Sequence, residues 1–345
     1  MKKIVLTAVI LIVAVLLSGC SKGKRFTLYT WDEMFPHEIL QGFEKEMNVK
    51  INYINFDTNE TMLARLQAAK GGSYDLVIAD DYILEIVIAE GLAQSLDKSK
   101  IPNYTNINPI YQKQFYDSGD AYTIPYGAGV QTIVYDPRRV NINISGYADL
   151  WDPSLKNSVG IIGNFRVING MALKVLGKTY NTNDLELIRS AGDLLVKLAP
   201  NIRMIRDDQL EDELLAGEVS VAVMYTSQVT MAKLADPELE VVFPKEGIGF
   251  GIMAGFIPSK APNPDIAHAF LNYILDARRG AECFEYLGYY CTYSASDGFI
   301  DTEYKEFLTL PSGFNNRMEM IRNVSPEAEE EHNLVWTLFK TAAGQ

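Results

Sequence analysis

The sequence contains only three histidines and three cysteines, which limits the chemistry that it can support. His37, His268 and His332 are scattered along the chain, with no His-Glu-x-x-His motif and no cysteine partner nearby. Zinc sites and catalytic triads need such groupings, so we expect no metal, no cofactor and no enzymatic activity. Cys283 and Cys291 have no metal-binding spacing. The sequence leaves open whether they pair or remain buried free thiols.

Glycine-rich nucleotide motifs are also missing. Gly170 and the stretch Gly177-Lys178-Thr179 are too far apart for a phosphate loop, and no strand leads into them. Gly127-Ala128-Gly129 lacks the third glycine of a dinucleotide fingerprint, and a hinge is enough to explain it. The sequence therefore gives no indication of nucleotide binding.

The longest apolar run, Ile4 to Leu17, is shorter than the roughly 20 residues of a membrane-spanning helix. It follows Lys2-Lys3 and ends in Leu17-Ser18-Gly19-Cys20, which resembles the bacterial lipobox. We therefore expect residues 1–20 to be a lipoprotein signal peptide rather than an uncleaved anchor, with Cys20 lipidated and 21–25 as a tether. This places the protein in the periplasm or on the outer face of the cytoplasmic membrane.

Positive charge is scarce relative to negative charge, with 31 Lys and Arg against 44 Asp and Glu. Removal of residues 1–20 takes away two lysines and no acid, which moves the formal net charge from −13 to −15. An acidic surface attracts cations and argues against a nucleic acid partner. The length of the remaining chain favours two lobes over one core.

Strand–helix units dominate the first part of the chain. Leu76 to Ala79 is a short apolar run typical of a strand covered on both faces, and a helix follows it. Asp80, Asp81 and Tyr82 then lie at a strand's carboxyl end, where α/β sheets bind ligands. Capping of the helix by Asp81 is an equally good explanation for that residue. Trp31 follows the strand Phe26 to Tyr29 in the same way.

A second alternating series of strands and helices occupies the middle of the chain, and glycines near Gly127–Gly129 and Gly249–Gly251 mark two crossings between the series. We expect a two-lobed α/β fold in which 26–127 and 252–297 form lobe 1, and 128–251 and 298–345 form lobe 2.

Several stretches together resemble the spermidine/putrescine-binding proteins of bacterial ABC transporters. They run in the family's order over nearly the whole mature chain: Trp31-Asp32-Glu33, Asn59-Glu60-Thr61-Met62, Tyr74-Asp75-Leu76-Val77, Tyr122-Thr123-Ile124-Pro125-Tyr126, Tyr147-Ala148-Asp149-Leu150-Trp151, Gly217-Glu218-Val219, Val242-Phe243-Pro244-Lys245-Glu246-Gly247 and Gly288-Tyr289. The resemblance implies a periplasmic-binding-protein fold of the Venus flytrap kind, type II-like, with a double crossover hinge.

The resemblance also implies a ligand site between the lobes, where aromatic rings flank a methylene chain and carboxylates hold the amines. The residues at the matching positions are the aromatic walls Trp31, Tyr82, Tyr225 and Tyr289, the first-lobe acids Asp32, Glu33 and Asp80, and, in the second lobe, Asn164.

The second lobe departs from the family pattern. Acids are usual around the family's arginine, but the chain reads Asn164-Phe165-Arg166-Val167 there, and Gly251 and Met253 replace a tryptophan and an aspartate. A buried ammonium without a carboxylate partner costs several kcal/mol. Either Asp80 and Asp32 supply the charge, or the ligand is not a diamine.

The resemblance implies a monomeric receptor that delivers a polyamine to ABC permease subunits. Fewer acids favour fewer amines, so we expect putrescine rather than spermidine. The alternatives are a receptor for another small cationic or zwitterionic organic solute, or a surface-interaction lipoprotein that keeps the fold.

Overall fold

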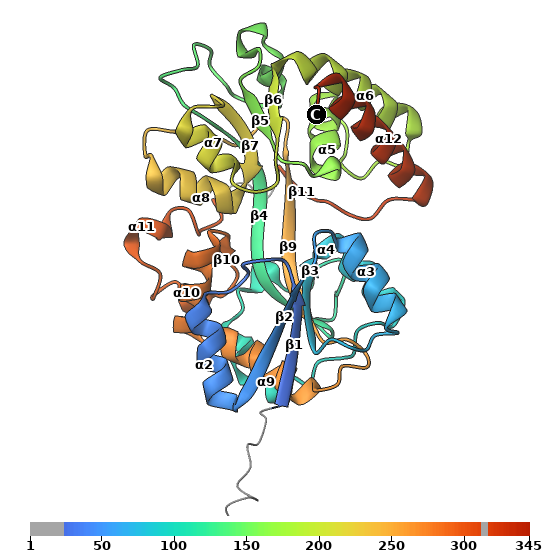
Figure 1. Ribbon diagram of the computed structural model, residues 1–345, viewed down its shortest axis with the longest axis vertical. Coiled ribbons are helices and arrows are strands. Elements are labelled where there is room, and N and C mark those ends of the chain that lie inside the picture. Colours follow the sequence, from blue (N-terminus) through green and yellow to red (C-terminus); the bar gives the residue numbers. More distant parts are fainter. Residues whose placement is uncertain (1–23, 312–316) are drawn as a thin grey trace, which may run out of the picture.

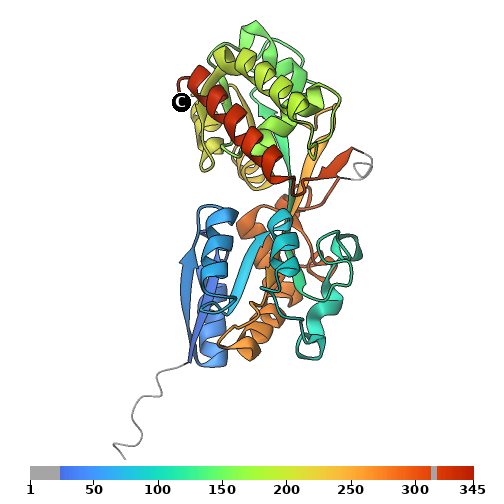
Figure 2. The same cartoon turned by 90° about the vertical axis from the view of Figure 1, so that its right-hand side faces the viewer.

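The structure of the protein, a computed structural model, describes residues 24–311 and 317–345. The expected signal peptide and Cys20 lie outside these residues. Lys24 and Arg25, which we expected in a tether, instead begin the first strand, where they pair with Val49 and Lys50. The chain forms two α/β lobes, one above the other, that meet at a narrow waist (Figures 1 and 2).

The first lobe is built on three parallel strands, with sheet order β2-β1-β3-β9. Its strands are β1 (Lys24–Thr30), β2 (Val49–Asn55) and β3 (Leu76–Asp80), and its helices are α2 (His37–Met47), α3 (Asn59–Ala68), α4 (Asp81–Ala89), α9 (Pro264–Ile274) and α10 (Ala277–Leu287). The apolar run Leu76 to Ala79 is fully buried, as expected for a strand covered on both faces.

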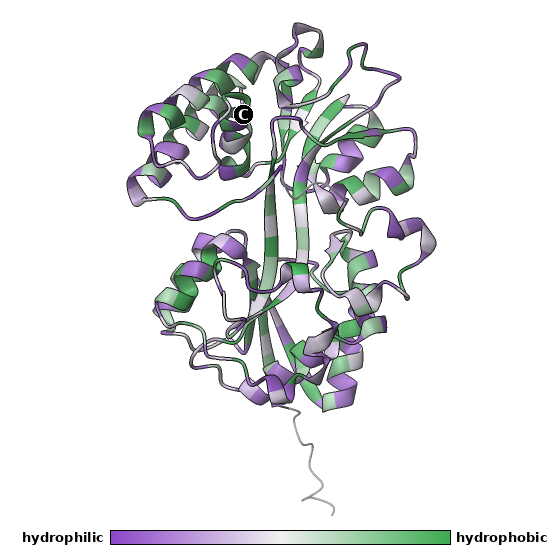
Figure 3. Ribbon diagram, turned by 180° about the vertical axis from the view of Figure 1, so that it is seen from behind, coloured by the Kyte–Doolittle hydropathy of each residue, from purple (hydrophilic) through white to green (hydrophobic). Residues whose placement is uncertain are grey.

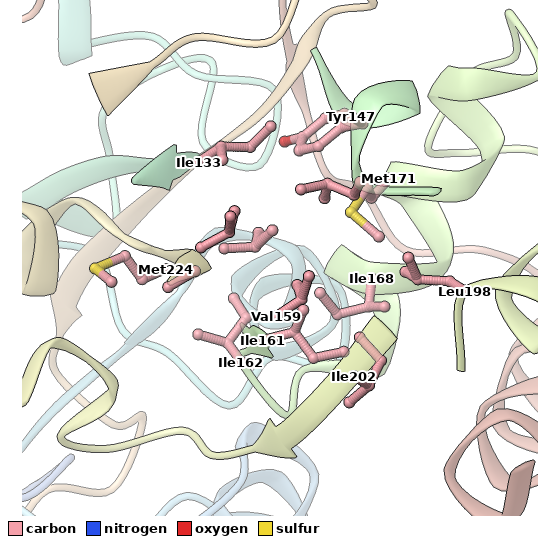
Figure 4. Close-up of a cluster of buried hydrophobic side chains, with 14 of the residues drawn as sticks. Ile133, Tyr147, Val159, Ile161, Ile162, Ile168, Met171, Leu198, Ile202 and Met224 are labelled. Carbon is pink, nitrogen blue, oxygen red and sulfur yellow. The ribbon is translucent and has the colours of Figure 1, made fainter. Parts of the chain in front are cut away.

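The second lobe repeats this plan with the parallel order β7-β5-β6. Its strands are β5 (Val159–Ile161), β6 (Ile202–Ile205) and β7 (Val221–Tyr225), with β8 (Glu240–Val242) at the edge, and its helices are α5 (Phe165–Val175), α6 (Leu185–Leu198), α7 (Leu210–Ala216), α8 (Thr226–Ala235) and α12 (Pro326–Ala342). Figure 4 shows part of the core that these elements enclose, including Ile133, Val159 and Ile168.

Two long antiparallel strands, β4 (Thr123–Tyr135) and β9 (Ile248–Phe256), connect the lobes. The first part of β4 pairs with β9, and Gln131–Tyr135 pair with β7 of the second lobe. Pro125, Gly127 and Gly129 would be expected to interrupt a strand, but the structure keeps one continuous strand with an irregularity between Pro125 and Gly127.

The chain returns to the second lobe near its end. β10 (Tyr290–Cys291) pairs with β4, α11 (Thr302–Lys305) follows, and β11 (Met318–Met320) pairs with the start of β9. Ile300 and Leu308 belong to the core of the first lobe. We therefore propose that the last lobe boundary lies between Leu308 and Met318 rather than at residue 298. The other boundaries remain proposals.

Helix faces follow the hydrophobic periodicity of the sequence. Ala267, Phe270, Leu271 and Ile274 all lie on the buried side of α9, as predicted. Figure 3 shows helices that alternate between hydrophobic and hydrophilic faces around both lobes. Cys283 and Cys291 are buried free thiols. Within 24–311 and 317–345, no helix is long and apolar enough to span a membrane.

Candidate functional site

Asp80 ends β3 and precedes α4 at the edge of the first lobe. Asn59, at the start of α3, is 2% exposed and donates from Nδ2 to Asp80 Oδ2 at 2.8 Å. The Asp80 amide donates back to Asn59 Oδ1 at 3.3 Å. Asn59 therefore holds the carboxylate in place without neutralising its charge.

Burial raises the pKa of Asp80 to about 6, and the nearby Glu60 adds to the rise, while the hydrogen bond from Asn59 and the Trp31 side chain oppose it. A carboxyl with such a pKa holds a charge that its own surroundings do not fully stabilise. An added cation would stabilise that charge.

Tyr82 joins the same network from the first turn of α4. Its hydroxyl accepts a hydrogen bond from Asn59 Nδ2 at 2.9 Å and donates to Glu60 Oε1 at 3.0 Å. The sequence analysis named Asn59 and Glu60 only within a stretch shared with the family and gave them no role in the site. In the structure it is the Thr58 side chain that caps α3, which leaves the Asn59 amide for Asp80 and Tyr82.

Trp31 lies at the end of β1 and packs against Phe56, with ring centroids 4.6 Å apart. Its Nε1 is buried and makes no hydrogen bond, yet it lies near enough to Asp80 to favour the ionised carboxylate. Asp32 and Glu33 are both exposed, and their charges act on Tyr53 and Tyr286. The structure thus brings Trp31 to Asp80, whereas the exposed Asp32 and Glu33 are not among the groups that mainly shift the pKa of Asp80.

Asp81 is buried, and both of its carboxylate oxygens accept hydrogen bonds from backbone amides. Its Oδ1 accepts from its neighbour Tyr82 N at 2.8 Å, and its Oδ2 accepts from Ile252 N in β9 at 2.9 Å. Burial, followed by the charge of Asp80, raises its pKa well above the usual range. Asp81 therefore ties α4 to a crossing strand instead of acting as an ordinary helix cap.

Tyr225, Asn164 and Tyr289 meet across the boundary between the lobes. Tyr225 ends β7 and Asn164 caps α5, accepting from Arg166 N at 3.1 Å and Val167 N at 3.2 Å. Burial raises the pKa of Tyr225, followed by the charges of Asp207, Tyr289 and Asp80, while a hydrogen bond from Asn164 opposes the rise. One second-lobe hydroxyl therefore lies within reach of first-lobe groups.

Glycines in β4 make room for the Tyr289 ring. A Cβ at Gly129 would lie 2.8 Å from Tyr289 Cδ1, and one at Gly127 would lie 3.6 Å from Tyr289 Cβ. The Tyr289 pKa rises to about 12 through burial, and a hydrogen bond with Ser227 of α8 opposes the rise. Tyr289 therefore lies across the crossing strand and contacts both lobes.

Met253 lies directly opposite Asp80 in the pairing of β9 with β3. Directly opposite side chains on neighbouring antiparallel strands are close enough to interact. A carboxylate at position 253 would therefore repel Asp80, and the methionine removes that repulsion.

Arg166 is buried at the base of the second lobe, next to the first. It pairs with Glu329 at 3.3 Å and donates to the Arg322 carbonyl at 3.2 Å. A pocket of about 200 Å³ separates α3 and α4 from these residues, and Tyr82, Glu60, Arg166 and Glu329 are among its lining residues. Along residues 24–311 and 317–345, no group of three or more His, Cys, Asp or Glu side chains could hold a metal ion.

Comparison with known proteins gives one consistent family. The model of the bacterial extracellular solute-binding proteins matches residues 38–304. A spermidine/putrescine-binding periplasmic protein of Salmonella typhimurium is 35% identical over 274 residues, which cover 78% of each chain. The putrescine-binding periplasmic protein PotF of Escherichia coli is 28% identical and covers 93% of this chain and 92% of its own.

A solved structure described as a putative spermidine/putrescine ABC transporter from Listeria monocytogenes matches with a TM-score of 0.86 and 27% identity. The match covers 92% of this chain and 99% of that one. The TpPotD lipoprotein of Treponema pallidum, at 24% identity, has a TM-score of 0.81 over 92% of this chain and 99% of its own, which shows a shared fold.

Proposed function

Because this chain belongs to the family of bacterial extracellular solute-binding proteins, we propose that it is the polyamine-binding receptor of an ABC importer. The resemblance in the sequence is confirmed, and with it the periplasmic-binding-protein fold. Such proteins are receptors and not enzymes. The observation that carries the ligand assignment is Asp80, a partly buried carboxylate that is hydrogen-bonded by Asn59 and whose raised pKa shows that a cation would stabilise its charge.

The surroundings of Asp80 suit an amine joined to methylene groups. Trp31 and Tyr82 lie beside it in the first lobe, and Tyr225 and Tyr289 lie near it where the lobes meet. Aromatic faces contribute about 0.5–2 kcal/mol each to a nearby cation, and a carboxylate adds a charge-assisted hydrogen bond. We propose putrescine, with spermidine as a weaker ligand.

Calorimetry of the purified, ligand-free protein tests this assignment. Putrescine and spermidine are expected to bind, putrescine more tightly, whereas glutamate and glycine are expected to give no heat. Binding of an anionic or neutral solute in the absence of any polyamine signal would exclude the polyamine assignment while leaving the family membership intact.

Closure of the lobes around the ligand would exclude water and present a distinct shape to the permease. Small-angle scattering is expected to show a smaller radius of gyration with saturating putrescine than without it. An unchanged radius would argue against closure as the signal to the permease.

Cys20 is proposed to hold the protein at the outer face of the membrane. It lies outside the residues that the structure describes, and the proposal is supported by the Leu-Ser-Gly-Cys sequence. Stable anchoring needs two acyl chains, as a diacylated cysteine provides. Cys20→Ser should release the protein from the membrane fraction, and equal membrane association of the variant would exclude lipidation as the anchor.

A further inference from the structure

Three loops meet at the ligand-facing edge of the second lobe. β6, β5 and β7 are neighbouring parallel strands, so their carboxyl ends lie together. Gly163 follows β5, Asp207 follows β6, and Tyr225 ends β7. Asp207 therefore lies at the same sheet edge as the tyrosine that reaches the first lobe.

Hydrogen bonds fix the position of Asp207. Gly163 N donates to Asp207 Oδ1 at 2.8 Å, and a Cβ at Gly163 would lie 2.6 Å from Oδ2, so a larger residue there would displace the carboxylate. Gln228 accepts from Tyr225 N at 3.2 Å and donates to the Asp207 carbonyl at 3.4 Å. The loop that carries Asp207 is thus attached to the start of α8.

Within the part of the chain that the structure describes, Asp207 forms no ion pair. Arg206, its neighbour, forms ion pairs with Asp208 at 3.9 Å and with Glu213 instead. Among the described residues no donor reaches Asp207 Oδ2. Although solvent reaches the side chain, partial burial raises the Asp207 pKa, with the charge of Asp208 adding to the rise. The second lobe therefore offers one positioned, unpaired carboxylate.

The charges of Asp207 and Asp80 both act on the Tyr225 hydroxyl. After burial, the largest influence on its pKa is the charge of Asp207, followed by Tyr289 and then Asp80. Two carboxylates from different lobes thus act on one hydroxyl group, and Tyr289 lies near it as well. A linear dication could contact one carboxylate at each end.

Resting on the proposed function, we propose that Asp207 is the second-lobe charge partner of the ligand and binds the ammonium distal to Asp80. It does so in place of the second-lobe acids of the family pattern, where this chain has Asn164 and Val167. Two carboxylates match a diamine one to one, so Asp207 is a specificity-determining residue for diamines over monoamines.

The test compares putrescine with butylamine, which keeps one amine and a chain of the same length. Putrescine should bind the unaltered protein roughly ten- to hundredfold more tightly than butylamine, as expected for a hydrogen bond between charged groups. In Asp207→Asn, which can still accept from Gly163 N, the putrescine affinity should fall by that factor and the preference over butylamine should disappear. Asp208→Asn, the matched control, should change neither affinity.

A rescue variant separates charge from structure. Asn164 lies against the Tyr225 hydroxyl, so Asn164→Asp in the Asp207→Asn background should restore at least part of the putrescine preference. No recovery in a folded double variant, judged by its thermal unfolding, would overturn the proposal. If Asp207→Asn does not fold, Asp207→Ser takes its place in the same measurements.

The outcomes distinguish this proposal from the function on which it rests. An unchanged putrescine affinity in Asp207→Asn, together with a large loss in Asp80→Asn, would overturn the role of Asp207 and leave the polyamine receptor standing. An unaltered protein that binds no polyamine would overturn both.

Discussion

The two lobes place different polar groups at the ligand site between them. In the first lobe Asp80 is hydrogen-bonded by Asn59 and lies beside Trp31, whereas in the second lobe the neutral groups Tyr225 and Asn164 lie at the starts of two helices and Asp207 follows a neighbouring strand. Helix N-termini favour anions, so a cationic ligand needs a carboxylate beside each of them. The first lobe, with Asp80, can therefore hold an amine by itself. The second lobe then adds the groups that recognise the rest of the ligand.

Replacement of Asp80 should have the largest effect. Asp80→Asn removes a buried charge partner and should weaken putrescine binding roughly a hundredfold in calorimetry. The exposed Asp32→Asn should change the affinity little. Equal losses in the two variants would show that the acids of the first lobe act together and that the buried position has no special role.

The same variant should be more stable without ligand. The folded-state pKa of about 6 lies above the ordinary value of 3.8, so stability falls as pH rises from about 4 to 6 and the cost is fully present at pH 7. Asp80→Asn removes a cost of up to roughly 3 kcal/mol. A lower melting temperature at pH 7 would contradict this account of the buried charge.

The hinge allows a matched pair of substitutions at facing positions. Gly129 and Gly251 are partners across β4 and β9, but a Cβ at Gly129 meets the Tyr289 ring at 2.8 Å, whereas one at Gly251 finds only Asp81 Oδ2 at 3.9 Å. Overpacking costs about 1–3 kcal/mol, so Gly129→Ala should lower the free energy of unfolding by that amount. Gly251→Ala should change it much less. Similar losses at both positions would show that the pairing of the strands, not the Tyr289 ring, excludes a side chain.

Putrescine affinity should decrease in acid. Asp80 holds a cation only when it is ionised, and its pKa of about 6 implies a loss of roughly tenfold between pH 7 and pH 5. Calorimetry across this range measures the loss of affinity. In Asp80→Asn, the pH dependence that comes from ionisation of Asp80 should be absent. A putrescine affinity that does not change with pH in the unaltered protein would mean that the ligand does not bind the Asp80 carboxylate.

The smallest expected effect concerns the second-lobe hydroxyl. Tyr225→Phe keeps the ring but loses the hydrogen bond with Asn164, worth about 0.5–1.5 kcal/mol, so putrescine affinity should fall only a few-fold. Tyr286→Phe, on the exposed surface near Asp32, serves as the control and should have no effect. A hundredfold loss in Tyr225→Phe would place the main recognition in the second lobe instead.

Most helices and the central strands could be predicted because their apolar residues recur at regular spacing. α6 and α9 lie where periodicity places them. The length of β4 could not be predicted, because Pro125 and the nearby glycines look like the end of a strand. Only the pairing of β4 with β9 keeps the strand continuous. β6 was missed for a related reason, since Arg203 interrupts a strand of four residues.

The position of Asp80 at the end of a strand could be predicted from the apolar run before it, whereas Tyr225 was named only through the family resemblance. Asn59 was not recognised because an asparagine before a helix is explained equally well as a cap. Asp207 lies among the charged residues Arg206 and Asp208, which gives its position no local signal. Only the parallel pairing of β5, β6 and β7 brings it to the cleft.

The pairing of the two crossing strands has a mechanical consequence. Hydrogen bonds join Thr123–Val130 of β4 to Phe250–Phe256 of β9, so sliding one strand along the other would break several of them at once. Bending the pair as a ribbon keeps them intact. The ladder therefore favours bending or twisting of the lobes over sliding, and a transporter that senses the angle between the lobes could distinguish a loaded receptor from an empty one without contacting the ligand.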